Sequence, residues 1–177
     1  EREEKKTRAD AGEGSHAARE VFDEAESLSD PGFLESIFSG SAESLSDTRL
    51  AQPALVVTEV AIYRHLVCCG TTPNCCAGHS LGEIPALVAA ESIAFEDAFR
   101  LTQTRARLMS ENVPEGGMAA VLGLSPHAIE EILPEDVDVA NYNGPQQTVI
   151  SGSRVGLDTA EAALKAAGAK RVLRLPV

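Results

Sequence analysis

Basic residues are scarce in this sequence. Lys and Arg number 15 against 27 Asp and Glu, which gives a formal net charge of -12 over 177 residues. Binding to nucleic acid or to an anionic membrane requires a basic surface, so neither partner is expected. No apolar run approaches the ~20 residues that span a bilayer, and the polar N-terminus has no secretory h-region. These absences favour a cytoplasmic protein.

Cysteine is also sparse, and its spacing is unusual. The four cysteines form two adjacent pairs, Cys68-Cys69 and Cys75-Cys76. Zinc ligands are usually separated by two to four residues, so neither a metal site nor a disulfide framework is expected. We expect these cysteines to be small buried hydrophobic residues in a reducing cytosol.

The most informative segment is the hexapeptide GHSLGE at 78–83. It contains the Gly-x-Ser-x-Gly pattern that places a serine on a sharp strand-to-helix turn, where glycines leave room for the crowded backbone. Residues 74–77 fit a brief buried strand before it, and residues 84–90 fit a buried helix after it. Ser80 is therefore the candidate nucleophile, at a helix N-terminus that can stabilise an oxyanion. The alternative is a plain strand-to-helix turn with a capping serine.

The remaining periodicity predicts two parts after a polar segment at 1–15. Helical spacing indicates helices over 16–28, 33–38, 48–67 and 95–112, with a Ser-rich turn after the second. From residue 118 the predicted order changes to β-α-β-β-α-β, with strands over 118–124, 137–142, 147–151 and 171–177 and helices over 126–133 and 157–167. This is the ferredoxin-like order, and it defines parts 16–117 and 118–177.

Several motifs together carry a family resemblance. GHSLGE at 78–83, AQPAL at 51–55 and TRARLM at 104–109 resemble malonyl-CoA:acyl carrier protein transacylases, and so do three later motifs: MAAVLG at 118–123, NYNGP at 141–145 and AAGAKR at 166–171. The resemblance covers nearly all of residues 16–177. It implies an α/β fold with a partial α/β-hydrolase-like acyltransferase core and a ferredoxin-like (βαββαβ) subdomain. It also implies malonyl-CoA as substrate, acyl carrier protein as partner, and no bound cofactor or metal.

The resemblance implies roles for individual residues. Ser80 matches the nucleophile, the backbone N–H of Leu81 matches an oxyanion donor, and Arg105 matches the arginine that binds the free malonyl carboxylate. A planar guanidinium can bind a carboxylate through two hydrogen bonds, which lysine cannot do. The alternative for Arg105 is a surface arginine in an ion pair.

Four further residues match substrate-binding positions. His79 points away from Ser80 on a sharp turn, so it is expected to line the pocket rather than to act as the base. Met109 either lines the acyl pocket or packs in the core. Gln52 and Asn143 match polar residues near the family's site, although turn or capping roles compete.

Two expected family segments are missing from the sequence. Residues 1–15 contain no Gly-Gln-Gly-Ser-Gln loop, and the Ser-His motif with the catalytic histidine does not occur. His16, His65 and His127 lie in predicted helices without a supporting motif. A serine without its base loses several powers of ten in rate. We therefore expect a fragment of a malonyltransferase of fatty acid synthesis. The alternatives are a polyketide synthase acyltransferase domain, a serine hydrolase and a catalytically inactive relative.

Overall fold

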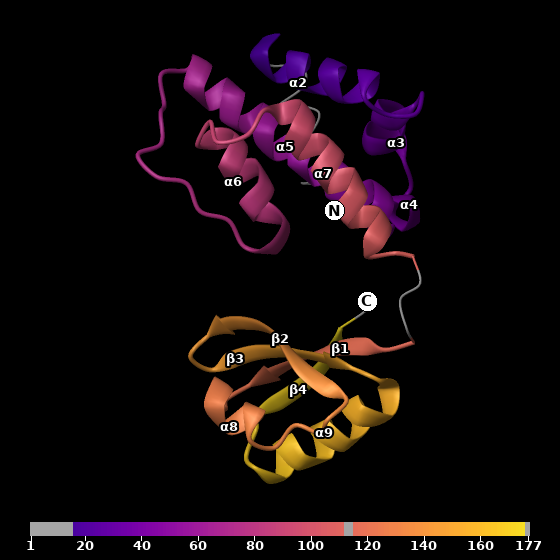
Figure 1. Cartoon of the computed structure of the whole chain (residues 1–177), viewed down its shortest axis with the longest axis vertical. Helices are drawn as coiled ribbons and strands as arrows, with labels where there is room; N and C mark the ends of the chain where they lie inside the picture. The colour runs from indigo at the N-terminus through magenta and orange to yellow at the C-terminus, as the bar shows by residue number, and fades with distance from the viewer. Residues whose placement is uncertain (1–15, 112–114, 176–177) are drawn as a thin grey trace. The chain divides into compact units, whose positions relative to one another are not determined.

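Figure 1 shows the computed structural model of the chain, which describes residues 16–111 and 115–175. The chain divides into two compact units near residue 112. In the described residues the first unit is helical, and the second combines an antiparallel sheet with helices. The predicted segment at 1–15 lies outside the described residues.

The helical unit follows the predicted periodicity closely. The predicted helices at 16–28, 33–38, 48–67 and 84–90 are confirmed within one or two residues, and the helix predicted over 95–112 ends earlier, at Leu108. The structure also contains a short helix where a turn was predicted, because the Ser41 side chain accepts a hydrogen bond from the Ser44 N–H and caps it. The elements are α2 (His16–Ser27), α3 (Phe33–Ser39), α4 (Ala42–Ser46), α5 (Thr48–Cys68), the 3-10 turn η1 (Ser80–Gly82), α6 (Glu83–Ala89) and α7 (Phe95–Leu108).

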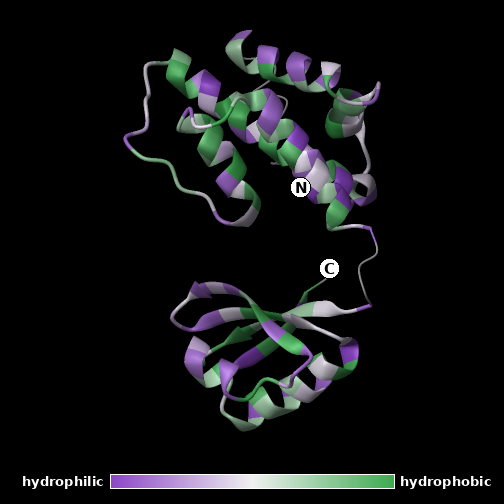
Figure 2. Ribbon diagram, in the orientation of Figure 1, coloured by the Kyte–Doolittle hydropathy of each residue, from purple (hydrophilic) through white to green (hydrophobic). Residues whose placement is uncertain are grey.

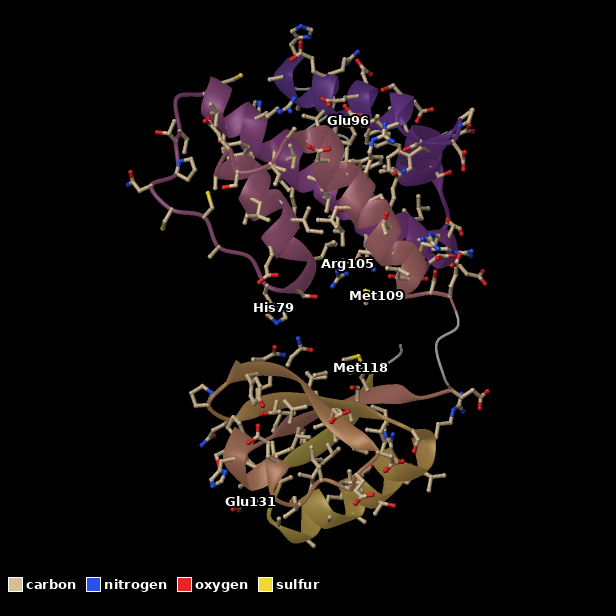
Figure 3. All side chains as sticks on the ribbon, viewed as in Figure 1. His79, Glu96, Arg105, Met109, Met118 and Glu131 are labelled. Atoms are coloured by element: carbon tan, nitrogen blue, oxygen red, sulfur yellow. The ribbon has the colours of Figure 1, made fainter. Side chains whose placement is uncertain are left out.

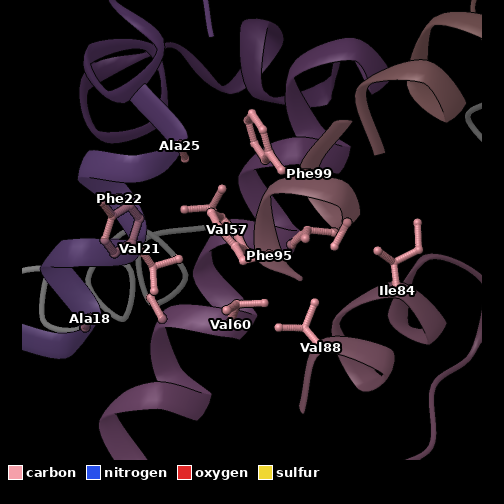
Figure 4. Close-up of a cluster of buried hydrophobic side chains, with 13 residues drawn as sticks. Ala18, Val21, Phe22, Ala25, Val57, Val60, Ile84, Val88, Phe95 and Phe99 are labelled. Carbon is pink, nitrogen blue, oxygen red and sulfur yellow. The ribbon is translucent and has the colours of Figure 1, made fainter. Parts of the chain in front are cut away.

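Helix α5 forms the centre of this unit. Its buried residues Val57 and Val60 contact apolar side chains from α2, α6 and α7 in one cluster, shown in Figure 4. Asp47 caps α5 by accepting a hydrogen bond from the Arg49 N–H at 2.9 Å. In Figure 2, α2 alternates between hydrophilic and hydrophobic segments, as expected for a helix with one buried face. Burial of each large aliphatic side chain contributes roughly 1.5–3 kcal/mol, so this cluster fixes α5 against α7.

The strand predicted over residues 74–77 is absent. Residues 71–79 are irregular and exposed, and the described part of the helical unit contains no strand. A strand requires a hydrogen-bonding neighbour, and the described residues of this unit provide none. The expected burial of the cysteines is therefore also wrong, because Cys68, Cys69, Cys75 and Cys76 are all exposed.

The second unit contains the six elements in the predicted order. They are β1 (Gly117–Leu122), α8 (Pro126–Glu130), β2 (Val137–Gly144), β3 (Gln147–Gly152), α9 (Arg154–Ala166) and β4 (Arg171–Leu175). All strand pairs are antiparallel in the order β2-β3-β1-β4, and Ala119 lies opposite Ile150 on one side and Arg174 on the other. Helices α8 and α9 cover one face of this sheet (Figure 1).

The turn between the strands predicted over 137–142 and 147–151 is shorter than those bounds imply. Strand β2 continues through Gly144, which pairs with Gln147, and the turn residues are Pro145 and Gln146. Asn143 is consequently a strand residue and not a turn residue. Within the described parts of the chain, no helix combines the length and the apolar character needed to cross a membrane.

Candidate active site

Ser80 lies on a strained turn directly before a helix. Its φ is 55°, and among the described non-glycine residues only Glu91 shares a positive φ. Such a conformation costs a side-chain-bearing residue energy and often occurs at functional sites. Ser80 begins η1, which continues into α6 at Glu83. The exposed hydroxyl is therefore presented by a sharp turn, as the motif predicts for a nucleophile.

The two glycine positions of the motif differ in whether a side chain would fit there. A Cβ on Gly78 would lie 2.0 Å from the carbonyl oxygen of Gly82, so no larger residue fits there without moving the backbone. Gly82 itself has a helical φ of -62°, and a Cβ at this position would meet no described atom within 4 Å. The predicted steric reason therefore holds for Gly78 but not for Gly82 in the described part of the chain.

Arg105 lies beside the serine hydroxyl. Its Nη2 donates to the Ser80 Oγ at 3.0 Å, and its Nη1 donates to the Gln52 Oε1. Packing of α5 against α7 brings Gln52 and Arg105 together across 53 residues of sequence. Within residues 16–111 and 115–175, no carboxylate lies within 4.0 Å of this guanidinium. The surface ion pair considered as an alternative for Arg105 does not form with any described residue.

Gln52 is the buried partner of Arg105. Its side chain is 6% exposed, and its Nε2 donates to the Thr48 Oγ1 at 2.6 Å and to the Met109 Sδ at 3.5 Å. Gln52 lies inside α5, so it is neither a turn residue nor a cap. Sequence reasoning missed Thr48 as a member of this group, although its spacing of four residues from Gln52 on a helix was a usable signal.

Met109 lies at the C-terminal end of α7 and is 52% exposed. Core packing, one of its two expected roles, is therefore excluded, and its sulfur instead contacts the Gln52 amide. Figure 3 shows His79, Arg105 and Met109 at one end of the helical unit. His79 is exposed next to Ser80 in the sequence.

The backbone of Leu81 is well placed at the turn. The Gly82 N–H donates to the His79 carbonyl at 3.0 Å, whereas the Leu81 N–H donates to no carbonyl of another described residue. A backbone donor directly after the nucleophile is the usual arrangement of an oxyanion hole. The role of Leu81 as an oxyanion donor stays a prediction.

The other histidines have partners elsewhere. His16 pairs with Glu20 at 3.4 Å in α2, and His127 pairs with Glu131 at 3.5 Å in the second unit. His65 lies thirteen residues after Gln52 on α5, roughly 20 Å along the helix axis. No group of three or more His, Cys, Asp or Glu side chains within the described ranges could hold a metal ion.

Asn143 is exposed at the end of β2 and belongs to the second unit. The structure gathers Ser80, Arg105, Gln52 and Met109 within the helical unit, whereas the role of Asn143 stays a prediction.

A family model described as the acyl transferase domain matches residues 13–177. The chain belongs to the acyl transferase domain family. A malonyl CoA-acyl carrier protein transacylase of Bacillus subtilis is 42% identical over 169 residues, covering 91% of this chain and 53% of that protein. The enzyme of the same name from Escherichia coli K12 is 47% identical over 146 residues, covering 78% and 47%.

Solved structures agree with this family. A malonyl-transacylase in complex with a type II PKS acyl-carrier protein is 38% identical, with a TM-score of 0.86, and is matched over 96% of this chain and 57% of that one. The chain spans about half the length of the curated relatives it matches. The part of the acyl transferase domain that it represents includes the Ser80 turn and the Arg105 cluster.

Proposed function

We propose that this chain carries the nucleophile and the acyl-binding arginine of a malonyltransferase that moves malonyl from coenzyme A to acyl carrier protein. The names of its relatives support this activity. The observation that carries it is the 3.0 Å contact between the Arg105 guanidinium and the Ser80 hydroxyl. The cluster offers a cation beside the nucleophile, which suits an acyl group that bears its own carboxylate.

The length of a malonyl group fits this contact. Its carboxylate carbon and its thioester carbonyl carbon are separated by two C–C bonds, about 2.5 Å. An arginine that binds the carboxylate must therefore lie close to the atom that attacks the carbonyl. In this proposal the guanidinium exchanges its hydrogen bond to Ser80 for hydrogen bonds to the incoming carboxylate.

The proposed reaction has two steps. The Ser80 Oγ forms a bond to the thioester carbonyl carbon, and the resulting oxyanion accepts a hydrogen bond from the Leu81 N–H. The C–S bond then breaks, coenzyme A leaves as a thiol with the serine proton, and a malonyl ester remains on Ser80. In the second step the phosphopantetheine thiol of acyl carrier protein attacks the ester carbonyl carbon and the acyl C–O bond to Ser80 breaks. The thiol proton passes to the Ser80 oxygen, and malonyl remains as a thioester on the carrier protein. The resemblance predicts a histidine as the base for both transfers.

The finer description of the fold is also proposed. The six-element order and the strand order β2-β3-β1-β4 support a ferredoxin-like second unit. The turn at Ser80 supports an α/β-hydrolase-like core for the first. We further infer that the transfer takes place in the cytoplasm without a bound cofactor.

Incubation of the chain with malonyl-CoA followed by intact-mass measurement tests the proposal. We expect a malonyl adduct that is absent in Ser80→Ala. Thr104→Val, which alters an exposed residue beside Arg105, serves as a control that should keep the adduct. Rapid hydrolysis of neutral esters without a malonyl adduct would instead favour a serine hydrolase.

A further inference from the structure

We propose that Thr48 is a positioning residue that orients the Arg105 guanidinium through the amide of Gln52. The three side chains form a continuous series of hydrogen bonds that ends on the Ser80 hydroxyl. The effect that Thr48 should have on the choice of acyl group rests on the proposed malonyl transfer. Its effect on the orientation of the Gln52 amide is independent of that proposed function.

The donors and acceptors fix the orientation of the amide. A guanidinium only donates hydrogen bonds, so the Gln52 oxygen must face Arg105. Both N–H groups of the amide then point away from Arg105, one to the Thr48 Oγ1 at 2.6 Å and one to the Met109 Sδ at 3.5 Å. A thioether sulfur is a weak acceptor, so the Thr48 hydroxyl is the stronger of the two groups that hold the amide nitrogen in this position, while the donor-only guanidinium of Arg105 opposes rotation of the amide by 180°. A rotated amide would place N–H groups against the guanidinium.

A neutral support leaves the positive charge of Arg105 available. Gln52 holds the guanidinium with an uncharged oxygen, and Thr48 holds Gln52 with an uncharged hydroxyl. The carboxylate nearest to Thr48 in the sequence, Asp47, is bound to the Arg49 side chain, with an Nη2–Oδ2 distance of 2.9 Å. Thr48 therefore fixes the direction of Arg105 without reducing its attraction for an anionic acyl group.

The first test uses nuclear magnetic resonance of the ¹⁵N-labelled chain without any acyl donor. The Gln52 amide signals are identified by their loss in Gln52→Leu. Thr48→Val replaces the hydroxyl with a methyl group, and we expect Gln52 amide hydrogens to exchange with solvent about tenfold faster. The Arg105 Nε signal should shift as well. Thr48→Ser, which keeps the hydroxyl, should restore both signals.

The matched control is Thr58→Val in the same helix. Thr58 is buried, and its hydroxyl donates to the Ala54 carbonyl at 2.7 Å, so this variant also loses a hydroxyl hydrogen bond of α5. It should leave the Gln52 and Arg105 signals unchanged. If Thr48→Val does not fold, amide exchange of Gln52 is compared between Thr48→Ala, which lacks the hydroxyl, and Thr48→Ser, which keeps it. Unchanged Gln52 exchange in the variants without the hydroxyl would overturn the proposal, as would equal perturbation by Thr48→Ser.

The second test compares acylation of Ser80 by malonyl-CoA and by acetyl-CoA. In Thr48→Val the ratio of malonyl to acetyl acylation should fall about tenfold, because only the malonyl group depends on a correctly directed guanidinium. Equal losses with both donors would overturn the selective role of Thr48. If the unaltered chain forms no adduct with either donor, the proposed function fails, and the exchange measurement alone decides whether Thr48 orients Arg105.

Discussion

Replacing Arg105 with alanine would remove the only guanidinium that contacts the Ser80 hydroxyl in the described structure. In the proposed reaction this side chain binds the malonyl carboxylate, and an acetyl group has no carboxylate to bind. The substitution should therefore separate the two acyl groups. Malonyl transfer should fall sharply, whereas acetyl transfer should survive or improve.

The size of the loss follows from the geometry of the pair. A guanidinium can donate two parallel hydrogen bonds to a carboxylate, and each charge-assisted hydrogen bond contributes about 1.5–3 kcal/mol. Because Arg105 is half-buried and must give up its hydrogen bond to Ser80, we expect a net loss of about 2–4 kcal/mol. At about 1.4 kcal/mol per factor of ten, malonyl acylation should fall roughly 30- to 1000-fold. Acetyl acylation should change by less than about threefold, which corresponds to under 1 kcal/mol.

The same substitution also affects stability. Without Arg105, the buried Gln52 oxygen has no donor among the described residues, which costs roughly 1–3 kcal/mol. Urea denaturation of each variant is therefore measured beside the acylation rates. Arg105→Lys keeps the charge but cannot bind the carboxylate with two parallel hydrogen bonds. Its rate of malonyl acylation should therefore lie between those of the unaltered chain and of Arg105→Ala.

The assay follows intact mass with time after addition of malonyl-CoA or acetyl-CoA. A folded Arg105→Ala chain that loses both acyl groups to the same extent would refute carboxylate binding by Arg105. A malonyl rate equal to that of the unaltered chain would refute it as well.

Three further predictions concern the turn and the second unit. In urea denaturation, Gly78→Ala should destabilise the chain by at least about 2 kcal/mol, because its Cβ would meet the Gly82 carbonyl oxygen at 2.0 Å. Gly82→Ala should be nearly neutral in the same assay. Equal losses of stability in the two variants would contradict the steric argument. Ser80→Gly should be more stable than Ser80→Ala by about 1 kcal/mol in the same assay, since only the alanine keeps the cost of a positive φ. Hydrogen bonds from Lys165, assisted by Arg174, hold the pKa of Glu161 below its usual range. Glu161→Gln should therefore lower the free energy of unfolding near neutral pH and have little effect well below about pH 4. A difference in unfolding free energy that stays constant across this pH range would contradict the prediction.

The elements that the sequence predicted well are those whose signals are local. The apolar periodicity of α5 and α7 is contained in the segments themselves, and the structure confirms both helices. Helix α4 was missed because five residues carry too little periodicity, and only the Ser41 cap indicated it. The end of α7 at Leu108 was also not predictable, because the helical composition continues beyond it.

The absence of the strand predicted over 74–77 could not be foreseen by the same local reasoning. An apolar run such as Cys75-Cys76 indicates which residues suit a sheet, but a strand forms only where another strand supplies hydrogen bonds. That information is non-local, and in the described part of the helical unit no such neighbour exists. The segment is therefore exposed although its composition is apolar.

The candidate site was predictable in its members but not in its contacts. Ser80 followed from the motif, and Arg105, Gln52 and Met109 followed from the resemblance. Nothing in the sequence indicated that Gln52 contacts Arg105 across two helices separated by 53 residues. Thr48 was not predicted as a member of the site, although its spacing of four residues from Gln52 places both side chains on one side of the helix.

The charge around Arg105 distinguishes an acyl group with a carboxylate from a neutral ester. In a chain with a net charge of -12, an arginine readily finds a carboxylate, and Arg107 on the same helix pairs with Glu111 at 3.0 Å. Arg105, only two residues away, has the neutral Gln52 and Ser80 as its partners instead. A cation without a carboxylate partner among the described residues gives no advantage in cleaving a neutral ester. Beside a nucleophile it both attracts and orients a malonyl group within an acidic protein that otherwise repels anions. Electrostatics therefore favours transfer of a carboxylated acyl group over simple ester hydrolysis at this site.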